Sequence, residues 1–281
     1  MSSKIKSNSK DGSTTISTFI VIILLIITIY PVAFVMITSI KTTSEFYTNI
    51  WLLPKKLALN NYVLAWVSGH IGEYVLNSAI VVCISVVSIL VMGAIAAYSL
   101  ARLKLPFSNL ILFVILACML IPSEAIIMPL YLNVSKLHLA GTYISLIVPY
   151  IGWGLPMTIF IYHTFFKTLP AELLEAAKID GSGELMVFTK IVVPLMIPAT
   201  ATNAIFNFSG WWGEMIWSSI TLQTSNLRTI PLGIMSFNGQ FGTDWGPYSA
   251  AICIVLIPLV FIFIFTQKYF ISGLTGGAVK G

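Results

Sequence analysis

Residues 74–100 read YVLNSAIVVCISVVSILVMGAIAAYSL and contain no Asp, Glu, Lys or Arg. A helix needs about 20 mainly apolar residues to cross the hydrocarbon core of a bilayer, so this stretch predicts a transmembrane span. The composition agrees, because 57% of the 281 residues are hydrophobic and only 9% are charged, whereas a soluble domain has about 25% charged residues. A soluble enzyme and a nucleic-acid binder are therefore excluded.

Three other stretches are equally apolar, at residues 16–38, 142–166 and 248–266. Two more are interrupted, 109–132 by prolines and Glu124, and 191–209 by prolines and asparagines. Broken spans are tolerated where they face protein or a water-filled cavity. The sequence thus predicts an all-α integral membrane protein with six transmembrane helices. Its membrane domain, 16–272, lies between an N-terminal tail, 1–15, and a C-terminal tail, 273–281.

The distribution of Lys and Arg predicts the orientation. With the N-terminus in the cytoplasm, ten of these residues fall inside, namely Lys4, Lys6, Lys10, Arg102, Lys104, Lys167, Lys178, Lys190, Lys268 and Lys280. The other five, Lys41, Lys55, Lys56, Lys136 and Arg228, fall outside. Because cytoplasmic loops carry the excess of positive charge, we expect a multi-pass protein with both termini in the cytoplasm.

The sequence offers no sign of catalysis or of a bound cofactor. Its three cysteines and three histidines are scattered without metal-ligand or disulfide spacing. The glycine-rich ending GLTGGAVKG lacks the order G-x-x-x-x-G-K-[ST] of a phosphate-binding loop. We expect no catalytic, metal-binding or cofactor-binding residue in this chain.

The predicted cytoplasmic loop 167–190 is the chain's most chemically distinctive segment. Together with the start of the next span it reads KTLPAELLEAAKIDGSGELMVFTKIVVPLMIP, residues 167–198. A helix is expected to begin at Pro170 and to end at Gly181-Ser182-Gly183. Its spacing places Leu173, Ala176, Ala177 and Asp180 on one face, where small alanines allow a partner to approach closely. The alternative is an ordinary helix pair lying flat in the headgroups.

Several motifs carry a family resemblance. The sequence Glu175-Ala176-Ala177 followed by Asp180-Gly181, and then by Phe188, Ile191, Pro194 and Pro198, resembles the EAA loop of ABC importer permeases. Residues 77–107, 239–246 and 267–281 resemble the carbohydrate-importing, maltose-type branch, specifically its second permease subunit. The chain departs from this branch at Gly213-Glu214, where Asn-Asp or Asn-Glu is commoner, and at Glu124.

The resemblance implies a type I ABC importer permease that is not itself an enzyme. Its EAA helix would dock in a cleft of a separate ATP-binding subunit, and the ATP and Mg²⁺ would belong to that subunit. Glu175 would pair with a basic group there, Ala176 and Ala177 would permit close packing beside Asp180, and Gly181 would permit the sharp exit. The C-terminal tail 273–281 would reach into the interface of the ATPase pair.

The resemblance also implies the partners and the location. The partners would be a second homologous permease subunit, a pair of ATP-binding subunits and an extracellular sugar-binding protein. The chain would lie among the lipids of a prokaryotic plasma membrane, with no nucleic acid involved. It would import a sugar or oligosaccharide by alternating access.

Polar and aromatic residues near the spans are candidates for a substrate path. Asn207, Trp211, Trp212 and Glu214 combine aromatic faces with hydrogen-bonding groups, as sugar recognition requires. Tryptophans also form interfacial belts, and asparagines also join helices, so a structural role stays open. The rival function is a secondary transporter driven by an ion gradient, with Glu124 as its lone acidic candidate, although no internal repeat supports it.

Overall fold

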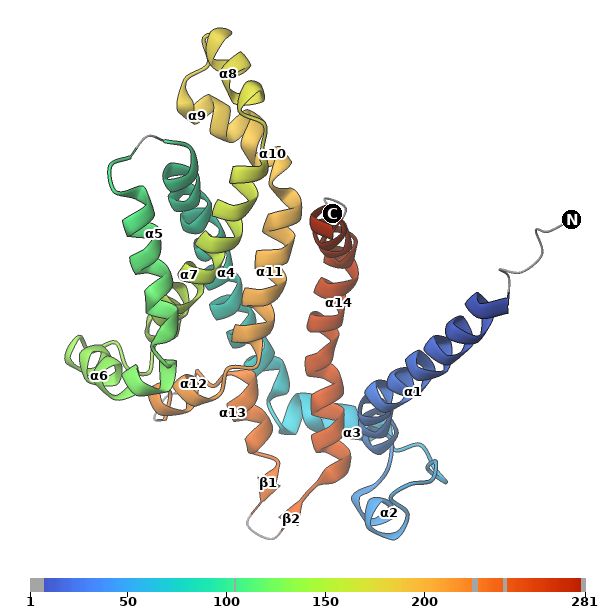
Figure 1. The fold of residues 1–281 in the computed structure, drawn as a ribbon. Coiled ribbons are helices and arrows are strands. Elements are labelled where there is room, and N and C mark those ends of the chain that lie inside the picture. The colour runs from blue at the N-terminus through green and yellow to red at the C-terminus, as the bar shows by residue number, and fades with distance from the viewer. Residues whose placement is uncertain (1–7, 104, 224–226, 240–241, 279–281) are drawn as a thin grey trace, which may run out of the picture. The chain divides into compact units, whose positions relative to one another are not determined.

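A computed structural model describes residues 8–103, 105–223, 227–239 and 242–278. Almost all of this chain is helical (Figure 1). Two compact units are present, Met1–His70 with Ser236–Ile254, and Ile71–Met235 with Val255–Gly281. We refer to them as unit 1 and unit 2 and describe each by itself.

Four helices are long and apolar enough to cross a membrane, as the four uninterrupted stretches predicted. They are α1 (Asn8–Ser39), α4 (Ile71–Arg102), α7 (Ile144–Thr168) and α14 (Trp245–Ala278). Two of them extend beyond the predicted spans. Helix α1 begins within the predicted N-terminal tail, and α14 continues through Ala278, within the predicted C-terminal tail.

The two interrupted stretches form bent helix pairs. The first consists of α5 (Ser108–Ala117) and the 3₁₀ turn η2 (Cys118–Leu120), followed by α6 (Ser123–Lys136) at an angle of 96°. Pro122 lies at this bend, where a helix cannot keep its hydrogen bonds. The span predicted at 109–132 is therefore sharply bent.

The second pair bends by 72° around Met196. It consists of α9 (Glu184–Val187), the π-helical turn η3 (Phe188–Val192) and α10 (Val193–Leu195), followed by α11 (Ile197–Trp212). By length and composition the described chain has four spans, or six if each bent pair counts as one.

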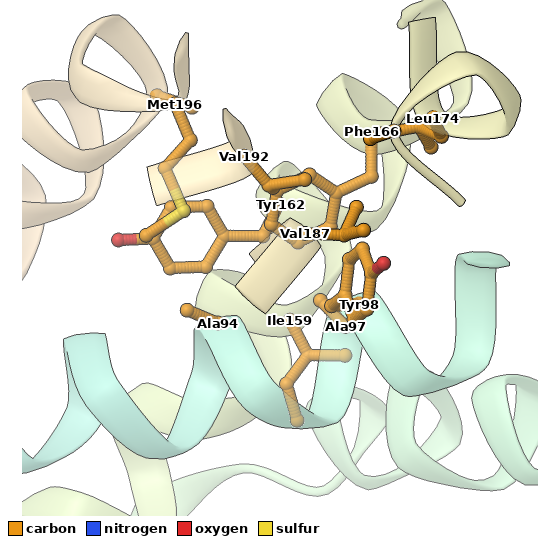
Figure 2. Close-up of a cluster of buried hydrophobic side chains, with 12 residues drawn as sticks. Ala94, Ala97, Tyr98, Ile159, Tyr162, Phe166, Leu174, Val187, Val192 and Met196 are labelled. Atoms are coloured by element: carbon orange, nitrogen blue, oxygen red, sulfur yellow. The ribbon is translucent and has the colours of Figure 1, made fainter. Parts of the chain in front are cut away.

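Helices α4 and α7 form the centre of unit 2, where small residues allow them to approach closely. A Cβ added at Gly93 would lie 2.7 Å from Cγ2 of Thr158, and one added at Gly154 would lie 2.6 Å from Cδ1 of Ile89. Such small residues are common where helices pack within membranes. The main cluster of buried side chains lies around these helices (Figure 2): Ala94, Ala97, Tyr98, Ile159, Tyr162, Phe166, Leu174, Ala177, Val187, Val192, Met196 and Ala199.

A second cluster in unit 2 joins α4, α6 and α7 to α12 (Ile216–Thr221) and its flanks: Val81, Val134, Leu146, Tyr150, Trp217 and Leu222. Figure 1 shows α12, α13 (Ile230–Met235) and α6 at one end of this unit, with α8 (Ala171–Ile179) and α9 at the other. The loop containing α8 is therefore held apart from the α12 end by the length of the bundle.

Unit 1 contains α1, α2 (Thr43–Thr48), α3 (Asn60–Val63), the π-helical turn η1 (Leu64–Ser68) and the start of α14. It also contains the antiparallel pair β1 (Asn238–Gly239) and β2 (Gly242–Thr243), in which Asn238 pairs with Thr243 and Gly239 with Gly242. The buried amide of Asn61 donates to the carbonyl oxygens of Ser39 and Lys41, at 2.8 and 2.7 Å. These bonds fix the chain where it leaves α1.

Candidate functional site

The predicted EAA loop forms a short helical hairpin, α8 followed by α9. Pro170 precedes the first helical residue as the N-cap of α8, and good helix formers follow it. The helix ends in a Schellman motif. The N–H of Gly181 donates to the carbonyl of Lys178, and that of Ser182 donates to Ala177, both at 3.0 Å. Gly181 has φ +83°, a left-handed conformation suited to glycine.

The hairpin packs against the rest of unit 2. Leu174 and Ala177 of α8 and Val187 of α9 are buried in the main cluster, which also includes Phe166 at the end of α7 (Figure 2). The guanidinium of Arg102, at the end of α4, donates to the carbonyl oxygens of Phe166 and Leu169. It thereby joins the ends of two long helices at the point where the chain enters the hairpin.

Polar contacts close the hairpin itself. The hydroxyl of Tyr98 in α4 donates to Oε2 of Glu184 at 3.1 Å, and Lys178 of α8 forms an ion pair with Glu184. The hydrogen bond from Lys178 lowers the pKa of the Glu184 carboxyl below its ordinary value. Because both members of this pair are exposed, it contributes little to stability.

The outward surface of the hairpin differs from the face that the sequence predicted. Ala176, Asp180 and Glu175 are exposed, and Leu173 is 42% exposed, but Ala177 is buried and packs inward with Leu174. Of the four residues predicted to share one face, only Ala177 is buried in this chain, and its contact with a partner stays a prediction. Three apolar residues that the sequence reading did not single out are exposed instead: Ile179 at 86%, Leu185 at 76% and Met186 at 55%.

The candidate path residues lie at the α12 end of unit 2 and along α11. Asn207 is buried, and its amide donates to Oγ1 of Thr158 at 3.0 Å and to the carbonyl of Asn203 at 2.9 Å. It thereby joins α11 to α7, which is the structural role that the sequence left open. Asn203 is 1% exposed, and its amide has no hydrogen-bond partner among the described residues.

The two adjacent tryptophans have different surroundings. Trp212 is buried, stacks on Phe208 with ring centroids 5.0 Å apart, and donates from Nε1 to the carbonyl of Val255 at 3.1 Å. Trp211 is only half-buried and stacks on Tyr150, with centroids 4.7 Å apart and planes 9° apart. Trp211 therefore belongs to a row of neighbouring rings with Tyr150 and Trp153, which we call the aromatic wall. Trp212 instead joins α11 to α14.

The carboxylate of Glu214 accepts three hydrogen bonds from its neighbours. Its Oε1 accepts from the N–H of Trp217 at 2.7 Å. Its Oε2 accepts from the N–H of Ser218 at 3.0 Å and from the hydroxyl of Tyr150 at 2.7 Å. A carboxylate that accepts from N–H groups in the first turn acts as a cap, so Glu214 stabilises the start of α12 and orients Tyr150.

Tyr150 and Trp153 complete the aromatic wall, and the sequence reading did not single them out. Trp153 lies 6.1 Å from Trp211 and contacts Trp217 edge-on at 5.8 Å, measured between ring centroids. Tyr150 and Trp153 are three residues apart and therefore share a face of α7. This spacing, together with the tryptophans that follow the next span, Trp211 and Trp217, is the sequence signal that could have found them. In the described part of the chain, no three His, Cys, Asp or Glu side chains gather as metal ligands would.

A nearly all-helical chain with several spanning helices and a packed helical hairpin at one end of unit 2 has the architecture of a membrane transport permease. Residues 89–276 match the family described as binding-protein-dependent transport system inner membrane component, and the chain belongs to this family. It is therefore a multi-pass membrane permease of a binding-protein-dependent transport system.

Two relatives and one solved structure agree with this assignment. The diacetylchitobiose uptake system permease protein NgcG of Streptomyces coelicolor is 32% identical over 94% of this chain and 88% of its own length. The melibiose/raffinose/stachyose import permease protein MelC of Bacillus subtilis is 32% identical over 89% of this chain and 91% of its own length. A bacterial ABC transporter that imports the acidic polysaccharide alginate shares the fold, with a TM-score of 0.81, 20% identity, and coverage of 95% of this chain and 100% of that one.

Proposed function

We propose that this chain imports a sugar or oligosaccharide by alternating access, driven by ATP hydrolysis on separate subunits. The observation that carries the proposal is the α8–α9 hairpin, which exposes Glu175, Ala176 and Ile179 while Leu174 and Ala177 fix it to the bundle. The named cargo of NgcG and MelC, which is diacetylchitobiose for one and melibiose, raffinose and stachyose for the other, supports a sugar as the substrate class.

The packing explains how a displacement of the hairpin would reach the spanning helices. Close-packed interiors transmit strain rather than absorb it. A push on α8 acts on Phe166 of α7 through the shared cluster, and Arg102 joins α4 to the same place. The hairpin also continues directly into the bent pair that ends in α11. Three helices of unit 2 would therefore respond to one docking event.

The proposed assembly contains two permease chains, this one and a homologous second subunit. A pair of ATP-binding subunits would hold the ATP and Mg²⁺, and an extracellular protein would deliver the sugar. In this assembly Glu175, Ala176, Asp180 and Gly181 contact an ATPase cleft, while Ala177 supports the helix from inside. The permease domain 16–272 would lie in a prokaryotic plasma membrane. Its loop 167–190 and the two terminal tails, 1–15 and 273–281, would be on the cytoplasmic side.

The sugar path of this subunit would pass the aromatic wall rather than Trp212 or Glu214. Trp211 keeps part of its surface exposed, and its Nε1, which is buried, has no hydrogen-bond partner among the described residues. A stacked indole offers the apolar face that a sugar ring requires. Asn207, Trp212 and Glu214 would shape this wall through their contacts with Thr158, Val255 and Tyr150.

Uptake measurements separate this proposal from a transporter driven by an ion gradient. Cells or vesicles that contain the complete system are given radiolabelled oligosaccharide, with either vanadate, which traps ATPases, or an uncoupler, which collapses the ion gradient. We expect vanadate to stop uptake and the uncoupler to leave it unchanged while ATP is held constant. Uptake that survives vanadate but stops with the uncoupler would overturn the ATP-driven mechanism.

A further inference from the structure

The loop after α1 presents a projecting apolar tip that the proposed transport function does not use. Trp51, Leu52 and Leu53 are 72%, 69% and 71% exposed. Three neighbouring exposed large apolar side chains are unusual on a surface that faces only water, and such patches mark interaction sites. Lys55 and Lys56 follow directly and are also exposed. We call residues 51–56 the tip.

The tip is a structured feature, because a buried lysine holds its base. Lys41 is 0% exposed, and its Nζ donates to the carbonyl oxygens of Asn49 and Ile50, at 2.8 and 2.9 Å. The chain is thus anchored immediately before Trp51. Further along, the N–H of Leu52 donates to Oδ1 of Asn49 at 3.2 Å, and the N–H of Lys55 donates to Oε1 of Glu45 at 2.6 Å.

The first residue of the tip, Trp51, lies beside two aromatic residues of α1. The ring centroid of Trp51 is 5.7 Å from that of Phe34 and 6.5 Å from that of Tyr30. The most apolar stretch of α1, which lies within Thr14–Ser39, is not buried inside the protein. The exposed tip is therefore continuous with an apolar surface of α1 that this chain leaves uncovered.

The helix geometry gives the depth of this contact. Thr14–Ser39 contains 26 residues, about 39 Å at 1.5 Å per residue, so it extends about 4–5 Å beyond each side of a hydrocarbon core of about 30 Å. Phe34 and Tyr30 lie about 7.5 and 13.5 Å from the Ser39 end. Trp51, beside them, lies close to the boundary between acyl chains and headgroups. Tryptophan is enriched at this boundary.

The charges and the shape of the loop fit a lipid headgroup. Lys55 and Lys56 line a hollow of about 640 Å³ together with Glu45 and with hydroxyl groups of the same loop: Thr42, Ser44 and Thr48. Two ammonium groups against one carboxylate leave the hollow with a net positive charge. Ammonium and hydroxyl groups are donors to phosphate oxygens. We propose that the tip is a lipid anchor, in which Trp51, Leu52 and Leu53 enter the edge of the bilayer while Lys55 and Lys56 contact anionic phospholipid headgroups.

Depth-dependent quenching tests this anchor. A single cysteine at Leu52 is labelled with a fluorescent probe in a full-length chain whose Cys83, Cys118 and Cys253 are replaced by serine. The protein is reconstituted in vesicles of phosphatidylcholine with phosphatidylglycerol, containing nitroxides at the headgroup or along the acyl chain. Labels at Leu24, in the middle of α1, and at Ile179, in the hairpin, give the deep and the water-exposed references.

We expect shallow nitroxides to quench the probe at position 52 several-fold more strongly than the probe at position 179, and deep nitroxides to quench most strongly at position 24. In vesicles with phosphatidylglycerol, quenching at position 52 should be weaker in the double variant Lys55→Gln, Lys56→Gln than in the parent by roughly twofold or more. In phosphatidylcholine alone, quenching at position 52 should be the same in the variant and the parent. Quenching at position 52 as weak as at position 179 would overturn the anchor and leave the tip as a surface for a protein partner. An unchanged response in the lysine variant would overturn the contact with anionic headgroups.

Discussion

The hydroxyl of Tyr98 in α4 donates a 3.1 Å hydrogen bond to Oε2 of Glu184, the first residue of α9. The ring of Tyr98 also meets Phe166 edge-on, with centroids 5.9 Å apart, and lies 5.0 Å from Phe188. The side chain of Tyr98 therefore connects α4 to the end of α7, to α9 and to the π-helical turn η3.

Replacing Tyr98 with Phe would keep these ring contacts and remove the hydrogen bond. Such a bond contributes about 0.5–1.5 kcal/mol, so we expect the midpoint of thermal unfolding to fall by about 1–6 °C. We also expect fewer sugar molecules imported per ATP hydrolysed, because the hairpin is less firmly held. Tyr143→Phe is the matched control, since it removes a 2.8 Å bond to Oδ1 of Asn77 in α4, away from the hairpin. An equal loss of coupling in both variants would show that the effect is only one of stability.

Substitutions at Gly181 separate backbone strain from docking. Its φ of +83° means that any β-carbon costs about 1 kcal/mol, yet a Cβ there has no atom of this chain within 4 Å. Gly181→Ala should therefore bring strain alone and reduce uptake partly. Gly181→Leu should abolish uptake and loosen the ATPase, measured by co-purification. Normal transport by Gly181→Leu with its ATPase bound would remove the mechanical basis of the proposed coupling.

Glu175 is exposed on the outer face of α8, so Glu175→Ala should leave the stability of the isolated permease unchanged within about 0.5 kcal/mol. Uptake should fall by less than in Gly181→Leu, because only an exposed charge contact is lost. Uptake of labelled sugar and thermal unfolding measured on the same preparation provide the check. A defect as complete as that of Gly181→Leu would assign Glu175 a larger role than a docking contact.

Two glycines of α7 provide a test of helix packing. A Cβ at Gly154 would lie 2.4 Å from Oδ1 of Asn207 and 2.6 Å from Cδ1 of Ile89, whereas one at Gly152 would have no neighbour within 4 Å. Gly154→Ala should destabilise the protein by about 1–3 kcal/mol through overpacking, and Gly152→Ala should not destabilise it. Thermal unfolding in detergent measures both. Equal stability of the two variants would contradict the close approach of α7 to α4 and α11.

The orientation predicts which loops a reagent can reach. In a chain without its native cysteines, single cysteines replace Ser182 in the hairpin and Thr243 in β2. A membrane-impermeant thiol reagent applied to intact cells should label position 243 and not position 182. Labelling of position 182 from outside would reverse the proposed topology and place the hairpin out of reach of a cytoplasmic ATPase.

Local rules explain what the sequence predicted well. The four uninterrupted spans follow from length and apolarity. One bend occurs at Pro122, and the other, around Met196, lies between Pro194 and Pro198. The end of α8 was predicted from Gly181, because the Schellman motif depends on neighbouring residues alone. The family resemblance is confirmed by the family match over residues 89–276.

Contacts between distant residues explain what the sequence did not predict. Ala176 and Ala177 are adjacent and identical, so only the position of the cluster around Phe166 decides which of them is buried. Trp212 and Trp211 likewise differ through their partners, Val255 for one and Tyr150 for the other. The occupation of Glu214 depends on Tyr150, which is 64 residues away. None of these partners follows from helical periodicity.

The loop after α1 has consequences for the order in which the protein is assembled. The bonds from Lys41 to Asn49 and Ile50 span only eight and nine residues, so they can form as soon as that segment leaves the ribosome. The stack of Phe46 on Trp245 and the bond from Trp245 to Tyr47, 198 residues away, must wait until the last helix is made. Because chains fold from the N-terminus during synthesis, the first loop remains incomplete through most of translation. Completion of this loop therefore reports that the last helix has reached its place.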